Sequence, residues 1–268
     1  MVRVGFVCVY HYSNKIRPQG YDCLIKFIES LNKNCSYDFT IYIIDNQSEK
    51  VPNIVNTIDN IIYTRIDDQF ISGLTGAWNL GIKQSYENKD DLIFALNDDL
   101  SFNHTINNFI KDILQHNENT DSIYGPTTNG IGKTYNWTRY MKKFGHTIDD
   151  LKKIIPNWIS FYNNRGINPQ YREKIKDSNI IIETTNKYDI NGYFIGFTKE
   201  CYSNYCLDNG CFFSDKIEYA WGGQETELQD RLWNKGLKTF IVTSCWIDHI
   251  KLKKYQIGKQ ITDELYLK

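Results

Sequence analysis

The chain has 268 residues, 41% of them hydrophobic and 24% charged, and these ordinary globular values exclude a disordered, collagen-like or coiled-coil protein. Its 31 basic and 32 acidic side chains give a net charge of -1, so it lacks the basic excess expected of a general nucleic-acid-binding protein. The length allows one large α/β domain or two small ones.

The first apolar run and the cysteines indicate the compartment of the protein. The run from Val4 to Tyr10 is too short for the core of a secretory signal and lacks a small-residue cleavage site. No stretch of about 18 uncharged apolar residues is present, so we expect no transmembrane segment. The 7 cysteines contain no C-x-x-C pair, which argues against a disulfide framework or a structural zinc site. We therefore expect a cytoplasmic protein.

Apolar runs of strand length recur along the chain, with helix-period segments between them. The strand-like runs are 3–10, 40–44, 60–66, 91–96, 122–124, 190–197, 238–242 and 245–247. The helix-period segments are 21–31, 74–85, 106–114 and 225–234, and Gly236 closes the last of them. This alternation predicts an α/β fold with a mostly parallel central sheet flanked by helices.

Between about 130 and 187 the alternation stops. This stretch is polar, contains Pro156 and Pro169, and carries several Trp, Tyr and Phe residues. We expect it to be an insertion or a lid, and the lysine-rich tail after His249 to run over the surface. One compact domain with an embedded lid is the simplest organisation.

Three polar residues, Asn97, Asp98 and Asp99, directly follow the apolar strand that ends at Leu96. Open α/β sheets bind ligands beyond the carboxyl ends of their strands, so two carboxylates and an amide there suit a divalent metal and a ribose. The alternative is a polar turn in which Asp98 or Asp99 caps the following helix.

A second group, Trp221, Gly222 and Gly223, leads into a helix whose first turn carries Glu225 and Glu227. Two glycines permit close approach of the backbone to a ligand, and a carboxylate at that point can face a pocket and accept a proton. The alternative is that these acids only stabilise the N-terminus of the helix.

Other strand ends carry further candidates. His249 lies just past the last apolar run, and a neutral imidazole beside the lysines that follow suits a metal-bound pyrophosphate, although a lone histidine is more often structural. Tyr10 and Tyr12 lie at the end of the first strand, where a ring can stack on a base, and Asp45 ends the second. The Asp45 carboxylate can accept the N3–H of uracil or a ribose hydroxyl.

The order of these features resembles the inverting glycosyltransferases of the GT-A fold, especially the family-2-type enzymes. In that group a strand-end Asp reads the base, an N-x-G-like helix start follows the third strand, an acidic motif binds metal and nucleotide sugar, and an E-D motif opens a later helix. The matching positions here are Asp45, 73–81 with Asn79, 97–99, and Gln224-Glu225. The W-G-G sequence is similar to that of the β-galactosyltransferase relatives, whose downstream histidine ligates manganese and is matched by His249.

The resemblance implies a single Rossmann-like GT-A domain over 1–268, with a nucleotide-sugar-binding half (1–125), an acceptor and catalytic half (126–250) and a surface tail (251–268). It implies inverting transfer of a sugar from a UDP-sugar to a hydroxyl of a glycan or glycoconjugate, with Mn2+ or Mg2+ held by Asp99 and His249 and with Glu225 as the general base. The implied donor-binding residues are Val9, Tyr10, Tyr12, Asp45, Asn79, Asn97 and Asp98. The implied sugar-binding residues are Gly192, Trp221, Gly222, Gly223 and Glu227.

The sequence departs from this family pattern in two places. Asn97 replaces the first acid of the acidic motif, which leaves Asp99 as the metal ligand, and the E-D pair is Gln224-Glu225. Whether Glu225 or Glu227 is the base stays open at this level. A sugar-phosphate nucleotidyltransferase would share the sheet, but its glycine-rich signature after the first strand is absent. A non-catalytic carbohydrate-binding or scaffold protein would tolerate both changes.

Overall fold

The computed structural model describes residues 2–66, 73–116, 121–128, 181–183, 190, 192–216 and 224–250. Nine strands in these residues form one mixed sheet. They are β1 (Arg3–Tyr10), β2 (Asp38–Asn46), β3 (Ile61–Ile66), β4 (Leu92–Asn97), β5 (Leu100–Ser101), β6 (Ser122–Thr128), β7 (Ile181–Glu183), β8 (Phe194–Thr198) and β9 (Lys238–His249).

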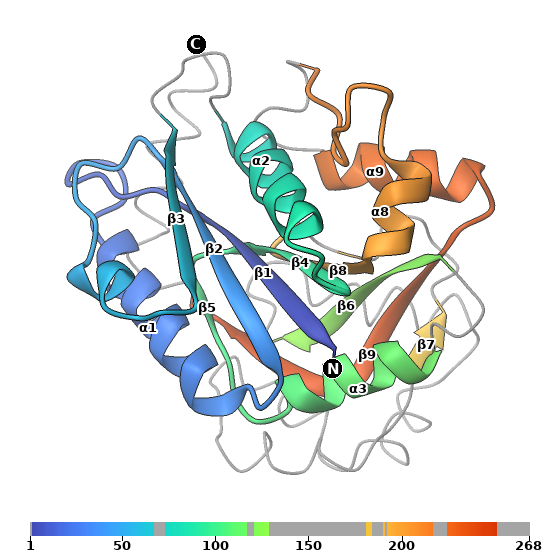
Figure 1. Cartoon of the computed structure of the whole chain (residues 1–268), viewed down its shortest axis with the longest axis horizontal. Helices are drawn as coiled ribbons and strands as arrows, with labels where there is room; N and C mark the ends of the chain where they lie inside the picture. Colours follow the sequence, from blue (N-terminus) through green and yellow to red (C-terminus); the bar gives the residue numbers. More distant parts are fainter. Residues whose placement is uncertain are drawn as a thin grey trace, which may run out of the picture.

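The strand order is β3-β2-β1-β4-β8-β6-β9-β5, and β7 pairs with β9 (Figure 1). Six strands, β1, β2, β3, β4, β6 and β9, run in one direction, and β5, β7 and β8 run against them. The predicted mostly parallel α/β sheet is therefore confirmed. The carboxyl ends of β1, β2, β3 and β4 meet at one edge, where β8 begins.

Helices follow the strands as the periodicity predicts. They are α1 (Gly20–Asn34), α2 (Leu74–Glu87), α3 (Ile106–His116), α8 (Lys199–Tyr205), α9 (Gln224–Asn234) and the 3-10 turn η1 (Asn53–Asn56). Gly236, with a φ of 83°, ends the turn after α9, as expected of a glycine at a helix C-terminus. The sequence patterns predicted neither α8 nor η1, because each has too few residues to show a helical period.

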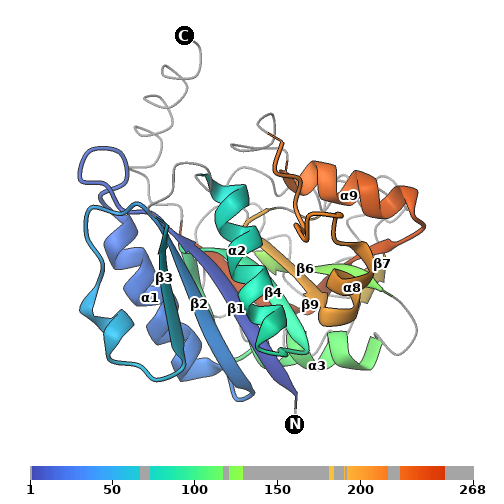
Figure 2. The ribbon, with the colours of Figure 1, turned by 45° about the horizontal axis from the view of Figure 1, so that its top comes forward.

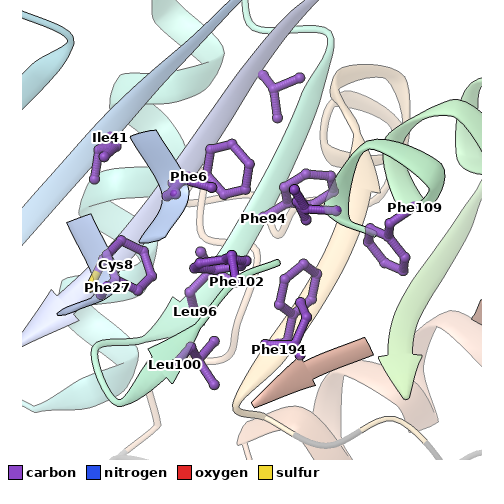
Figure 3. Close-up of a cluster of buried hydrophobic side chains, with 14 of the residues drawn as sticks. Phe6, Cys8, Phe27, Ile41, Phe94, Leu96, Leu100, Phe102, Phe109 and Phe194 are labelled. Carbon is purple, nitrogen blue, oxygen red and sulfur yellow. The ribbon is translucent and has the colours of Figure 1, made fainter. Parts of the chain in front are cut away.

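The two faces of the sheet carry separate cores, each covered by its own helices (Figure 2). Apolar side chains of α2, α8 and α9 pack on one face, and those of α1 and α3 pack on the other. The pleat of β1 explains the division, because Val7 and Val9 face α2 while Phe6, Cys8 and Tyr10 face α1. Figure 3 shows the second core, in which Phe6 and Phe94 lie among other aromatic rings.

The close packing of α2 on the sheet requires a glycine. A Cβ at Gly81 would lie 2.4 Å from Cγ1 of Val7 and 2.9 Å from Cγ1 of Ile44. Only a residue without a side chain lets the helix approach these two strands. This contact fixes the height of α2 above the sheet.

The structure differs from the expected elements in two places. Ile181–Glu183, inside the segment expected to be a lid, forms β7 and belongs to the sheet, whereas the rest of 130–187 lies outside the described residues. The two runs at 238–242 and 245–247 form one strand, β9, opposite which β6 has a register shift between Pro126 and Thr127. The tail 251–268 also lies outside the described residues. Across the described helices, none has both the length and the apolar character needed to span a bilayer.

Candidate active site

The candidate site lies where the carboxyl ends of the parallel strands meet the start of β8. Val9 of β1 stands opposite Asn97 of β4 in the parallel register. Across β4, the Asn97 backbone N–H donates to the carbonyl of Tyr193 at 3.0 Å. This pairing brings the acidic motif beside Gly192 and Tyr193.

Asp99 and His249, the predicted metal ligands, are brought together by the short β5–β9 ladder. Leu100 pairs with His249 in that ladder, and the Ile250 N–H donates to the Asp99 carbonyl at 2.7 Å. Oδ1 of Asp99 lies 3.1 Å from Nε2 of His249, and both residues are about 5% exposed or less. The Tyr193 ring stacks on the imidazole with centroids 5.0 Å apart.

The separation of these two atoms suits a shared cation. Two adjacent ligands of an octahedral ion, each at about 2.1 Å, lie roughly 3 Å apart. The Asp99 oxygen and the His249 nitrogen have that spacing and are ligand types that manganese accepts. Among the described residues no group of three metal-ligating side chains occurs.

Glu225, the predicted base, lies in the first turn of α9 against Gly192. A Cβ at Gly192 would lie 3.2 Å from Cδ of Glu225, 3.3 Å from its Oε2 and 3.5 Å from the Trp78 ring. Glu225 is half-buried, and its carboxylate makes no hydrogen bond or ion pair with the described part of the chain. A carboxylate in this state is able to accept a proton from a ligand.

Glu227 has a different role from the sugar contact that the sequence suggests. Its Oε1 accepts from Nε of Arg231 at 2.8 Å, and its Oε2 accepts from the Ser214 N–H at 3.3 Å. Arg231 also donates to the carbonyls of Tyr205 and Phe212. Both carboxylate oxygens of Glu227 are therefore engaged in fixing the 212–214 segment to α9.

Asn79 also differs from its predicted role in donor binding. Its Oδ1 accepts from the N–H groups of Phe212 and Phe213 at 3.0 and 2.9 Å, and its Nδ2 donates to the Phe213 carbonyl at 2.9 Å. The side chain is buried in α2, with the Phe213 ring against Trp78. Asn79 thus joins α2 to the segment that Glu227 and Arg231 hold from the other side.

Replacing Asn79 by Ala should lower the free energy of unfolding by about 2–4 kcal/mol, since each buried N–H that loses its acceptor costs roughly 1–3 kcal/mol. Urea denaturation measures this change. Asn32→Ala, at an exposed position of α1, is the matched control and should stay within about 0.5 kcal/mol of the parent. Equal small effects in the two variants would contradict the assignment of Asn79 as a structural clamp.

The residues at the end of β1 divide between core and surface. Tyr10 is fully buried on the α1 face, and its hydroxyl donates to the Lys50 carbonyl at 2.6 Å, so its ring does not face a base. Burial raises the pKa of the Tyr10 hydroxyl. Val9 is likewise a core residue. Tyr12 is half-buried, and its hydroxyl donates to Asn14, so among these three it alone presents a ring near the surface.

Asp45 is completely buried and holds three donors. Its Oδ1 accepts from the Ser48 N–H at 2.8 Å, and its Oδ2 accepts from the Tyr63 hydroxyl at 2.6 Å and from Arg65 at 3.0 Å. In this arrangement the carboxylate does not face a ligand. Asp45 thus fixes Tyr63 and Arg65 at the edge of the sheet, and its contact with a nucleotide base stays a prediction.

Asp98 forms a two-point ion pair with Arg17 from the loop after β1. Nη1 of Arg17 donates to Oδ2 at 2.8 Å and Nη2 donates to Oδ1. Burial raises the pKa of Asp98 above its usual range, Arg17 opposes the rise, and the charge of Asp99 adds to it. Asp98 thus pairs with Arg17 in this structure, and its predicted contact with the donor stays a prediction.

The role of Asn97 in donor binding stays a prediction. Its side chain is half-buried at the end of β4 and makes no hydrogen bond within the described residues. Trp221, Gly222 and Gly223 lie outside the described residues.

Sequence reasoning missed three residues of this site. Arg17 lies in a loop with no motif, and Trp78 belongs to the apolar stripe of α2. Tyr193 had one available signal, since it follows Gly192 directly and precedes an apolar strand.

Comparison with known proteins agrees with the fold. Among solved structures, S. aureus TarS 1–349 superposes with a TM-score of 0.54 at 11% identity, over 92% of this chain and 60% of that one. GalNAc-T7, crystallised with UDP, GalNAc and Mn2+, superposes with a TM-score of 0.59 at 14% identity, over 93% of this chain and 44% of that one. At this identity the likeness shows the GT-A fold alone, and the chain spans about half of each of these proteins.

A UDP complex of TarS 1–349 gives a similar result, with a TM-score of 0.52 at 12% identity over 92% of this chain and 60% of that one. A search of curated proteins finds no significant match. The family model described as "Glycosyl transferase family 2" matches residues 7–179, which is more than half of the chain. The chain therefore belongs to glycosyl transferase family 2.

Proposed function

We propose that the protein transfers a sugar from a UDP-sugar to a hydroxyl of a glycan or glycoconjugate, with inversion at the anomeric carbon. The observation that carries this proposal is that the Glu225 carboxylate lies beside the same short segment as the two proposed metal ligands, Asp99 and His249. Glu225 touches Gly192, and the next residue, Tyr193, stacks on His249, which contacts Asp99. The base and the metal ligands thus border adjacent residues of one segment.

The donor side of the site would consist of Asp99, His249 and Asn97. Asp99 and His249 would hold Mn2+ or Mg2+, which, when bound, would stabilise the negative charge of the leaving diphosphate. The amide of Asn97, a half-buried residue at the end of β4, would form a hydrogen bond to the donor. Tyr12, together with Tyr63 and Arg65, the two side chains that Asp45 holds, would border the uracil base of the donor.

On the acceptor side, Glu225 would accept the proton of the attacking hydroxyl. As the hydroxyl oxygen bonds to the anomeric carbon, the bond from that carbon to the diphosphate oxygen breaks and UDP leaves. Because Glu225 would act as a base and the mechanism uses no enzyme nucleophile, a single displacement would invert the configuration. We assign this step to Glu225 and not to Glu227, because both oxygens of Glu227 accept hydrogen bonds, from Arg231 and from the Ser214 N–H.

Replacing Gly192 by Ala should lower turnover by roughly 10–100-fold, since the new methyl displaces the Glu225 carboxylate and small misplacements of a catalytic group have effects of this size. The affinity for UDP should not change. A Cβ at Gly210 meets no atom within 4 Å, but the φ of 78° strains any side chain there. Gly210→Ala should therefore lower stability and leave turnover unchanged, which makes it a control for a general effect of replacing a glycine. Unaltered turnover in Gly192→Ala would contradict the assignment of Glu225 as the general base.

Calorimetric titration of the wild-type chain with UDP, in Mn2+ and then in EDTA, tests the donor side of the proposal. We expect UDP to bind and Mn2+ to strengthen the binding at least tenfold, because a cation held by Asp99 and His249 would attract the negative charge of the diphosphate. Absence of UDP binding under both conditions would overturn the proposed donor class.

A further inference from the structure

The middle residue of the acidic motif lies apart from its two neighbours. Asn97 and Asp99 border the candidate site. Asp98, in contrast, is 1% exposed, and both of its carboxylate oxygens accept hydrogen bonds from Arg17. Arg17 is itself largely buried, with 16% of its side chain exposed. An ion pair enclosed in this way has a definite geometry, because the planar guanidinium and the carboxylate meet at two points.

The ion pair connects two loops at the same edge of the sheet. Arg17 belongs to the loop between β1 and α1, and Asp98 follows β4, the parallel neighbour of β1. Nη1 of Arg17 also donates to the His11 carbonyl at 3.3 Å. The Asp98 carboxylate therefore fixes the loop after β1 against the acidic motif.

The charges of the motif give the ion pair a second consequence. Asp98 and Asp99 are adjacent carboxylates, and the guanidinium of Arg17 offsets the charge of the first. The carboxylate of Asp99 is then left to face His249. If Arg17 were lost, Asp98 would be a buried charge without its compensating partner, and the turn would have to rearrange to bring it to water.

We infer that Arg17 and Asp98 are positioning residues, which set the turn so that Asp99 and Asn97 face the metal and the donor. The inference rests on the proposed function, since it assigns the ion pair a role in metal-dependent binding of UDP. Neither residue touches the ligand. Their effect is on the placement of the Asp99 carboxylate relative to His249.

The test is a calorimetric titration of UDP, with Mn2+ and with EDTA, on the wild-type chain and on Arg17→Ala, Arg17→Lys, Asp98→Asn and the double variant Arg17→Ala/Asp98→Asn. We expect Arg17→Ala to weaken Mn2+-dependent binding about 10–100-fold, the range known for partners of metal ligands, and to leave binding in EDTA within about threefold. The Mn2+-dependent affinity of Arg17→Lys should fall between those of the wild-type chain and Arg17→Ala, because an ammonium keeps the charge but not the two-point contact. The double variant should bind no more weakly than Arg17→Ala, within about twofold.

The control is Lys199→Ala, which breaks an ion pair with Asp91 at the opposite end of β4. It should lower the melting temperature without altering Mn2+-dependent binding. Wild-type affinity in Arg17→Ala, or an equal loss of binding in Lys199→Ala, would overturn the inference. Should Arg17→Ala fail to fold, wild-type Mn2+ dependence in Arg17→Lys and Asp98→Asn would overturn it. If the wild-type chain itself shows no Mn2+-dependent binding of UDP, the metal-dependent donor binding that we propose is the part that fails.

Discussion

Replacing Glu225 by Gln should reduce turnover by about 10²–10⁴-fold, the range associated with a general base, while the affinity for UDP stays nearly unchanged. The structure supports this expectation, because the Glu225 carboxylate lies against Gly192 and makes no ion pair within the described residues. Glutamine has the same shape and cannot take the proton. Initial rates of UDP release at saturating donor, with affinity from calorimetry, measure the two quantities separately.

Glu227→Gln is the matched control for this experiment. Its carboxylate holds Arg231 and the Ser214 N–H, so the change should lower the free energy of unfolding by about 0.3–1 kcal/mol and leave turnover within about threefold. Small and equal losses of turnover in both variants would show that neither acid is the base. A large loss of turnover in Glu227→Gln alone would make Glu227 the general base in place of Glu225.

Replacing Asp99 by Ala should weaken Mn2+-dependent binding of UDP by about 100-fold or more, because even the partners of metal ligands contribute 10–100-fold. His249 would be left as the single described protein ligand of the proposed pair. Calorimetry of UDP in Mn2+ and in EDTA measures the change, and the affinity in EDTA should be unaltered.

Asp91→Asn serves as the control for Asp99→Ala. Asp91 precedes β4, at the end of the strand far from the site, and its carboxylate pairs with Lys199. The control should keep the Mn2+ dependence of the wild-type chain. An Asp99→Ala variant that also keeps it would remove the acidic motif from the metal site.

The fold was largely predictable because its signals are local. The alternation of apolar runs with helical stripes located all the long elements, and β1 and α1 extend over the expected residues. The elements that the patterns missed are short or depend on partners far away in the sequence. β5 has two residues, and it exists because Leu100 finds His249 in a ladder some 150 positions later in the chain.

The candidate site was predictable in place but only partly in residue roles. Strand ends located Asp99 and His249, which are in contact, and the glycines before α9 indicated Glu225. The pleat of β1 already implied that Tyr10 shares the face of Phe6 and Cys8, so its burial follows from strand periodicity.

The pairings of Asp45, Asp98 and Asn79 could not be predicted in the same way. Each side chain meets a partner from a separate segment, as Asn79 meets the backbone at 212–213. Such contacts depend on the register between neighbouring strands and on the close approach of α2 to the sheet. A single sequence carries no local signal of either.

The measurement that tests the account most directly is release of UDP from a series of UDP-sugars, in Mn2+ and in EDTA, by the wild-type chain and Glu225→Gln. We predict that at least one donor releases UDP, that EDTA suppresses the release, and that Glu225→Gln lowers it about 100-fold or more. If the wild-type chain binds UDP-sugars but releases UDP from none of them with glycan acceptors present, the account is contradicted, and the protein binds nucleotide sugars without transferring them.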